Sequence, residues 1–88
     1  MINKEIKLIN SLGLHARPCS MIAKEAMKFK ADFLVKKGDE EVNGKSVINL
    51  MMLAAPMDTK LFLTADGGDE QELMKKIVEL FNRKFDED

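Results

Sequence analysis

Residues 69–82 read DEQELMKKIVELFN, and no other stretch of the chain is marked so clearly as one structural element. Its apolar residues recur at three- and four-residue spacing, which predicts a helix with one broad apolar face. Asp69 is expected to be the N-cap, with Glu72 as its capping partner. Because such a face must cover another layer, the preceding residues are expected to supply that layer. The apolar face consists of Leu73, Met74, Ile77, Val78, Leu80 and Phe81.

The residues before this helix contain strand signals and two further helix signals. Alternating apolar side chains predict strands, and this alternation is seen at residues 2–9, 32–36, 40–42 and 60–64. A helix is expected to begin near Ala16, and a shorter one, capped by Ser46, is expected at residues 47–53. The order of elements is therefore strand, helix, strand, strand, helix, strand, helix, or βαββαβα.

This order of elements predicts an α+β fold in which residues 1–88 form a single domain. One four-stranded sheet with helices covering one face is the most economical arrangement of the predicted elements. The pattern does not fix the order of the strands, because a ferredoxin-like split arrangement has nearly the same order of elements.

The composition argues against several functional classes. The chain has 14 Lys and Arg against 15 Asp and Glu, so its net charge of -1 provides no field that would recruit nucleic acid. No apolar run approaches about 18 residues and the N-terminus lacks a secretion signal, so we expect a cytoplasmic protein without direct membrane insertion. Cys19 is the only cysteine, which excludes an intramolecular disulfide and a cluster of zinc-binding thiolates. No metal and no cofactor are expected.

His15, the only histidine, is the candidate reactive residue because it directly precedes a predicted helix. The first turn of a helix has backbone N–H groups without intrahelical partners and a partial positive charge, so an anion attached to His15 would be stabilised there. Arg17 offers a planar fork of donors that suits phosphate oxygens. The spacing alone also allows a plainer reading, in which His15 only ends a turn and caps the helix.

Two motifs resolve this choice by resemblance. Residues 12–18, LGLHARP, resemble the active-site signature of the HPr family, the histidine-containing phosphocarrier proteins of the bacterial phosphotransferase system. Residues 43–53, NGKSVINLMML, resemble the second signature of that family at the expected distance. The resemblance covers essentially the whole chain. It implies an open-faced β-sandwich, in which a four-stranded antiparallel sheet carries three helices on one face.

The same resemblance implies a mechanism for His15. In the family, Nδ1 of this histidine accepts a phosphoryl group from the phosphohistidine of enzyme I, which is charged by phosphoenolpyruvate, and donates it to an enzyme IIA domain. Arg17 would stabilise the bound phosphoryl group. Such a protein is a monomeric phosphoryl carrier and not an enzyme, and positioning against each partner accounts for the transfer.

The resemblance also implies a regulatory site and a docking surface. Ser46 matches the serine that a dedicated HPr serine kinase/phosphorylase modifies in many relatives, although Ser46 is also explained as a helix N-cap. The residues that match the family's docking surface for enzyme I and enzyme IIA are Val47, Ile48 and Met51. Polar residues expected around this patch are Arg17, Ser20, Lys24, Lys45 and Asn49.

Several alternatives remain at this point. Residues 52–55 and 80–88 look more like NPr, the nitrogen-related branch, than like the HPr of sugar transport, whereas residues 43–46 are shared across the family. A binding-only regulator controlled through Ser46 is the most serious competing function. An RNA-binding module would need a basic face with aromatic strand residues, and a ferredoxin-like metal chaperone would need two thiols.

Cys19 stands where the family usually has alanine, and its predicted inward side favours a packed residue over a redox role.

Overall fold

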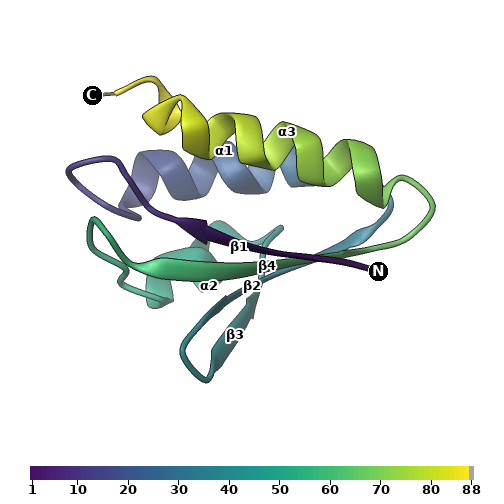
Figure 1. Ribbon diagram of the computed structural model, residues 1–88, viewed down its shortest axis with the longest axis horizontal. Helices are drawn as coiled ribbons and strands as arrows, with labels where there is room; N and C mark the ends of the chain where they lie inside the picture. The colour runs from purple at the N-terminus through teal and green to yellow at the C-terminus, as the bar shows by residue number, and fades with distance from the viewer. Residues whose placement is uncertain (88) are drawn as a thin grey trace.

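The computed structural model describes residues 1–87 and contains four strands, three α-helices and one short 3₁₀ turn (Figure 1). The order of the strands and α-helices is the predicted one, whereas the 3₁₀ turn was not predicted. The elements are β1 (Ile2–Lys7), α1 (Ala16–Ala26), β2 (Asp32–Lys37), β3 (Glu40–Asn43), α2 (Val47–Met52), β4 (Lys60–Asp66), α3 (Glu70–Asn82) and η1 (Lys84–Asp86).

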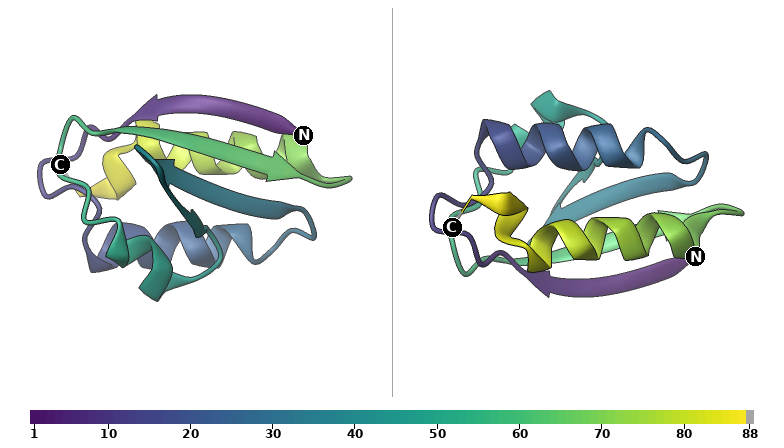
Figure 2. Two further views of the ribbon diagram at one scale, coloured as in Figure 1. Left: turned by 90° about the horizontal axis from the view of Figure 1, so that it is seen from below. Right: turned by 90° about the horizontal axis from the view of Figure 1, so that it is seen from above.

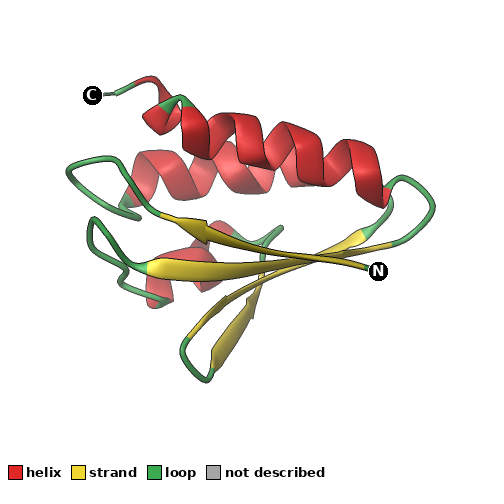
Figure 3. Cartoon of the chain, viewed as in Figure 1, coloured by secondary structure: helices red, strands yellow, loops and turns green. Residues whose placement is uncertain are grey.

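The four strands form one antiparallel sheet in the order β1-β4-β2-β3. Strand β4 pairs with β1 on one side and with β2 on the other, so that Leu63 lies opposite both Lys4 and Val35. This arrangement answers the question that the sequence left open, because β1 is an edge strand here and would be a central strand in a ferredoxin-like split sheet. Figure 3 shows the strands in yellow and the connecting loops in green.

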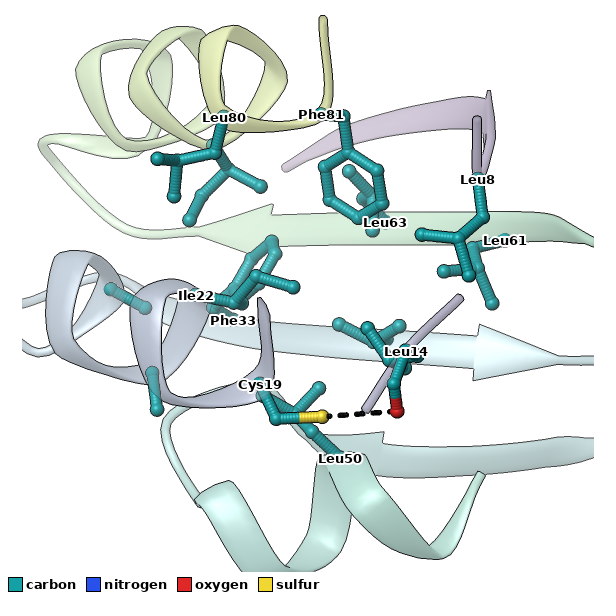
Figure 4. Close-up of a cluster of buried hydrophobic side chains, with 14 of the residues drawn as sticks. Leu8, Leu14, Cys19, Ile22, Phe33, Leu50, Leu61, Leu63, Leu80 and Phe81 are labelled. Carbon is teal, nitrogen blue, oxygen red and sulfur yellow. Dashed lines mark hydrogen bonds between the residues drawn. The ribbon is translucent and has the colours of Figure 1, made fainter. Parts of the chain in front are cut away.

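Helices α1 and α3 lie side by side over one face of the sheet, and α2 packs against α1 and β3 (Figures 1 and 2). The alternation predicted for β4 is confirmed, since Leu61 and Leu63 are buried beneath the helices whereas Phe62 is 42% exposed on the other face. Figure 4 shows side chains from both helices meeting those of the sheet. Burying each side chain of this size stabilises the fold by about 1.5–3 kcal/mol. None of the helices formed by residues 1–87 is both long and apolar enough to cross a bilayer.

The two predicted helix caps have different outcomes. Ser46 caps α2 as predicted, because its Oγ accepts a hydrogen bond from the backbone N–H of Asn49 at 3.2 Å. The capping box predicted for α3 is wrong. Asp69 occupies the N-cap position, but its carboxylate accepts hydrogen bonds from the backbone N–H groups of Lys30 and Ala31, both at 2.9 Å. The carboxylate therefore joins the start of α3 to the loop after α1.

Two elements, the first strand and the second helix, end earlier than predicted, and a loop begins at the end of each. Strand β1 ends at Lys7, because Leu8 turns to the loop before β4, where its N–H donates to the carbonyl of Thr59 and its carbonyl accepts from Asp58. Helix α2 ends at Met52, and the backbone reaches the left-handed region two residues later. Residues 54–59 therefore lie beside the loop that leads into α1.

The tight packing at Gly44 provides a test of this fold. A Cβ atom at Gly44 would lie 2.1 Å from the ring of Phe33, which is 1% exposed, so Gly44→Ala must displace a core side chain. We expect this change to lower the free energy of unfolding by about 1–3 kcal/mol. Gly68→Ala is the matched control, because its Cβ would meet no atom within 4 Å, and its effect should stay within about 0.5 kcal/mol. Urea unfolding followed by circular dichroism measures both, and equal effects would contradict the packing described here.

Candidate functional site

The loop between β1 and α1 carries His15 and is attached to the loop before β4. The N–H of Leu14 donates to the carbonyl of Ala55 at 2.8 Å, and the Leu14 side chain is 4% exposed. Gly13 has φ of +68°, and a Cβ atom there would lie 2.4 Å from the Ala55 oxygen. Only glycine can therefore make this close approach, which fixes the backbone directly before His15.

His15 is the N-cap residue of α1 by its backbone but not by its side chain. Its φ of -88° and ψ of -171° are extended, and its carbonyl accepts the first helical hydrogen bond, from the N–H of Cys19 at 3.2 Å. The imidazole makes no capping hydrogen bond. Within residues 1–87, no acceptor pairs with the backbone N–H groups of Ala16 and Arg17. The helix start therefore presents free donors beside the histidine, which is the environment that favours an anion.

The imidazole of His15 is held on one side by Glu87. Its Nε2 lies 2.9 Å from each carboxylate oxygen of Glu87, and the side chains of His15 and Glu87 are 35% and 13% exposed. Burial acts to raise the pKa of Glu87, but hydrogen bonds from His15 and Asn10, with the charges of His15 and Arg17, outweigh it and lower this pKa. The carboxylate is therefore ionised near neutral pH and can only accept, so Nε2 carries the proton. Nδ1 has no hydrogen-bond partner within residues 1–87.

A buried amide connects Glu87 to the histidine loop. Asn10 is 0% exposed, and its Nδ2 donates to the carbonyl of Gly13 and to Oε1 of Glu87, both at 2.7 Å. A buried amide that lost either acceptor would be left with an unsatisfied donor, which costs about 1–3 kcal/mol. Asn10 therefore ties the loop before His15 and the carboxylate beyond it into one unit.

The turn η1 places Glu87 at the site. Lys84, Phe85 and Asp86 have φ values of +53°, +53° and +61°, a left-handed conformation that costs non-glycine residues about 1–2 kcal/mol each. Phe85 is fully buried, with its ring centroid 4.9 Å from that of Phe81. Figure 2 shows the end of the chain, in yellow, beside the purple loop that precedes α1. Burial of Phe85 holds the strained turn in place, and the turn directs the chain back to His15.

The other predicted site residues lie on α1 and α2. Arg17 is exposed on the first turn of α1, close enough for its charge to act on Glu87. Ser20 and Lys24 follow it at helical spacing and are also exposed. Figure 4 places Leu50 of α2 beside Cys19, so the two helices pack together near this end of α1. Three apolar side chains of α2 predicted to face outward do so, with exposed fractions of 36% for Val47, 73% for Ile48 and 44% for Met51.

Two of the polar residues predicted around this patch have other contacts. The ammonium group of Lys45 donates to the carbonyl of Phe29 at 2.9 Å, near the C-terminal end of α1. The side-chain amide of Asn49 donates to Oγ of Ser46 at 2.9 Å. The head group of Lys45 is thus engaged away from the start of α1, and Asn49 belongs to the cap of α2.

Cys19 is packed in the core one helical turn from His15. It is 0% exposed, and its Sγ donates to the carbonyl of Leu14 at 3.6 Å (Figure 4). Burial raises the pKa of the Cys19 thiol to about 11. Because the thiolate is the reactive form, this environment matches the expected packed residue. Within residues 1–87, no three His, Cys, Asp or Glu side chains are grouped as a metal site would require.

Comparison with known proteins assigns this arrangement to a family. The family model described as "PTS HPr component phosphorylation site" matches residues 2–83. The chain belongs to the HPr family. The phosphocarrier protein HPr of Neisseria meningitidis serogroup A is 45% identical over 87 residues, covering 99% of this chain and 98% of the relative.

Two further HPr relatives agree with this assignment. The crystal structure of HPr-C-His from Thermoanaerobacter tengcongensis has a TM-score of 0.95 and 36% identity, covering 100% of this chain and 99% of that one. The HPr-like protein Crh of Bacillus subtilis is 36% identical and covers 89% of this chain and 92% of its own. The family is one of phosphocarrier proteins of the phosphotransferase system, not of enzymes, and the predicted open-faced α+β fold is confirmed.

The HPr motifs did not reveal two residues that contact the histidine site. Glu87 is separated from His15 by 72 positions, and Asn10 lies in a stretch that the sequence marks only as a turn. The pattern of residues 84–87 gives no sign of a left-handed turn, because the residues that adopt it are not glycines. Asn10 lies between Ile9 and Ser11 in the chain, so its neighbours give no sign that its side chain is buried.

The reactivity of Cys19 tests the burial of the thiol. With a pKa of about 11, only about one thiol in a thousand is ionised at pH 8, so alkylation by iodoacetamide should be much slower in the folded chain than in 6 M guanidinium chloride. Because folding raises this pKa, the associated stabilisation is complete below the unfolded value near 9.0 and is lost as the pH rises through about 11. Mass spectrometry measures the labelling rate in each state, and equal rates would show that the thiol is accessible in the folded chain.

Proposed function

We propose that this HPr-family chain accepts a phosphoryl group on Nδ1 of His15 from phospho-enzyme I and passes it to an enzyme IIA domain. Phosphoenolpyruvate would be the ultimate donor. The observation that carries the proposal is the state of the imidazole, which is 35% exposed, held through Nε2 and free of partners at Nδ1 within residues 1–87. Nδ1 therefore has an available lone pair at the start of a helix.

The surroundings of His15 suit a phosphoryl group that must be held and then released. The free N–H groups of Ala16 and Arg17 and the guanidinium of Arg17 can contact phosphoryl oxygens, and the helix dipole favours their negative charge. The side chain of His15 is 35% exposed and Arg17 is exposed beside it, so both can be reached by a partner protein. A carrier of this kind depends on each partner to supply the second half of the reaction site, so that alignment of the two proteins drives the transfer.

The exposed apolar residues of α2 support a docking role. Val47, Ile48 and Met51 form a small apolar surface on the helix that packs against α1, and Ser20 and Lys24 provide polar neighbours on α1. A modest patch of this type suits brief contacts, and the flexible thioether of Met51 suits more than one partner. Lys45 and Asn49 were predicted at the rim of this surface. The side chain of Asn49 would contribute through the cap of α2, whereas the ammonium group of Lys45 is bonded to the carbonyl of Phe29.

We further propose that residues 1–88 act as one domain, as a monomer, and in the cytoplasm, where phosphoenolpyruvate is made. The NPr-like segments at residues 52–55 and 80–88 favour the nitrogen-related branch, in which the final acceptor would be a regulatory enzyme IIA. Parallel transfer assays with a sugar-type and a nitrogen-type enzyme I would separate the two branches, and light scattering after gel filtration would measure the oligomeric state.

Phosphoryl transfer from labelled phosphoenolpyruvate tests the main proposal. With enzyme I present, we expect label on the chain that is labile to acid and stable to alkali, as a phosphohistidine is, and no label on His15→Ala. Arg17→Ala should still be labelled, at a rate reduced by about 10- to 1000-fold, because a donor to the transferred group has been removed.

Both variants must be shown to be folded by circular dichroism before their labelling is interpreted. Label on His15→Ala would place the phosphoryl group on another residue. Absence of label from the native chain with both types of enzyme I would contradict the carrier function.

A binding-only regulator controlled through Ser46 is the second candidate function. It is favoured by the position of Ser46, whose Oγ caps the helix that carries the apolar docking residues. A phosphate there would add about -1.5 to -2 charge, which the start of α2 tolerates but an acidic partner surface would repel. In this function His15 would be dispensable, whereas in the carrier function it is required.

Two substitutions separate the capping role of Ser46 from a regulatory one. Ser46→Ala should lower the free energy of unfolding by about 1 kcal/mol, because the cap is lost, and leave phosphoryl transfer unchanged. Ser46→Asp should preserve the cap and raise the KM for transfer from enzyme I through charge repulsion. Urea unfolding and transfer kinetics measure the two effects, and an unchanged KM in Ser46→Asp would argue against control through this residue.

A further inference from the structure

The contact between Glu87 and His15 assigns a role to a residue outside both sequence motifs. We propose that Glu87 is a positioning residue for phosphoryl transfer, whose carboxylate keeps the ring proton on Nε2 and orients the ring so that Nδ1 faces the incoming phosphoryl group. This inference rests on the proposed function of His15. It concerns how the ring is held and not whether it is phosphorylated.

The geometry of the contact defines which nitrogen can react. Both oxygens of the Glu87 carboxylate lie 2.9 Å from Nε2 of His15. An ionised carboxylate has no proton to donate, so the Nε2 nitrogen must be the donor in this pair. In a neutral ring the second nitrogen then lacks a proton and carries the lone pair. The carboxylate therefore selects the tautomer in which Nδ1 is the nucleophile.

The contacts that hold Glu87 in place distinguish this pair from an ordinary exposed ion pair. Its Oε1 also accepts from Nδ2 of Asn10, which is 0% exposed, and its own side chain is 13% exposed. The turn η1 is fixed by the fully buried ring of Phe85. Exposed pairs between long side chains are usually weak because both groups are mobile. Here the carboxylate is held from two sides, by a buried amide and by a turn with left-handed backbone.

The transfer of the phosphoryl group to His15 requires no proton transfer. As the Nδ1 lone pair of His15 forms the new N–P bond, the N–P bond of the phosphorylated donor histidine breaks and its electron pair remains on the donor nitrogen. The Nε2 proton stays on His15, so the phosphorylated ring carries a positive charge. Glu87 lies at the nitrogen away from the new bond and offsets that charge, while Arg17 is available to the phosphoryl oxygens.

Glu87 is negatively charged and yet lies close to a site that would hold an anion. The two ring nitrogens point to different sides of the imidazole, and the carboxylate contacts only Nε2. The free N–H groups at the start of α1 remain open to the phosphoryl group. Glu87 thus occupies one ring nitrogen, while the N–H groups at the helix start have no acceptor of their own within residues 1–87.

The free protein provides the first test, without any phosphoryl transfer. His15 is the only histidine, so its Nε2 proton can be assigned without ambiguity in nitrogen-15 NMR spectra. We expect this proton to exchange slowly with water in the native chain and rapidly in Glu87→Ala. Glu41→Ala is the matched control, because Glu41 is exposed on β3 and its side chain has no hydrogen bond or ion pair within residues 1–87.

Transfer kinetics from phospho-enzyme I provide the second test. Glu87→Ala should lower the maximal rate by about tenfold or more, as expected for a group that orients a functional histidine, and should leave KM within about twofold. Glu87→Gln keeps an acceptor oxygen but loses the charge, so its rate should be intermediate. Glu41→Ala should transfer at the native rate. A residue that only stabilised the fold would not produce this separation of rate from KM.

The outcomes distinguish the two proposals. Native rates and a slowly exchanging Nε2 proton in Glu87→Ala would overturn the role of Glu87 while leaving the carrier function intact. A loss caused entirely by KM would also overturn it, because Glu87 would then act in docking. If the native chain accepts no label, the carrier function fails, and with it the role of Glu87 in transfer.

Discussion

Strand β4 lies between β1 and β2, and the rest of the structure depends on this double pairing. Its buried face provides the floor for α1 and α3, which could not otherwise cover their apolar stripes. The residues that lead into β4 also hold the functional loop, through hydrogen bonds of Leu8 with Thr59 and of Leu14 with Ala55. The sheet therefore fixes the position of His15 through the connection at one end of a central strand.

The sequence predicted the elements and pointed to His15 as the candidate reactive residue because both inferences depend on local patterns. The three- and four-residue spacing in residues 69–82 and the alternation around Leu61 and Leu63 are direct consequences of which face of each element is buried. The start of α1 near Ala16 and the cap at Ser46 also follow from residue types next to one another in the chain. The two motifs, compared with a known family, then supplied a chemistry for His15.

What the sequence could not predict depends on residues that meet only in three dimensions. The carboxylate of Asp69 pairs with the loop after α1 rather than with its own helix, and no local rule distinguishes these two uses of an aspartate. The same holds for Asn10 and Glu87, whose contact spans 77 positions. A left-handed turn without glycine is visible only once burial of Phe85 is known, since local propensity opposes it.

The attachment of the His15 loop to the sheet has a consequence for the kinetics of encounter. A segment that becomes ordered only on binding imposes its entropy cost on every complex that forms. Here residues 8–15 acquire their conformation when the chain folds, because Leu8 and Leu14 are tied to residues 55–59 and Gly13 is held in close contact. The entropy cost of ordering this loop is therefore part of folding and is not repeated each time a complex forms. Successive partners then meet a surface that needs no rearrangement, which favours short-lived complexes formed at high frequency.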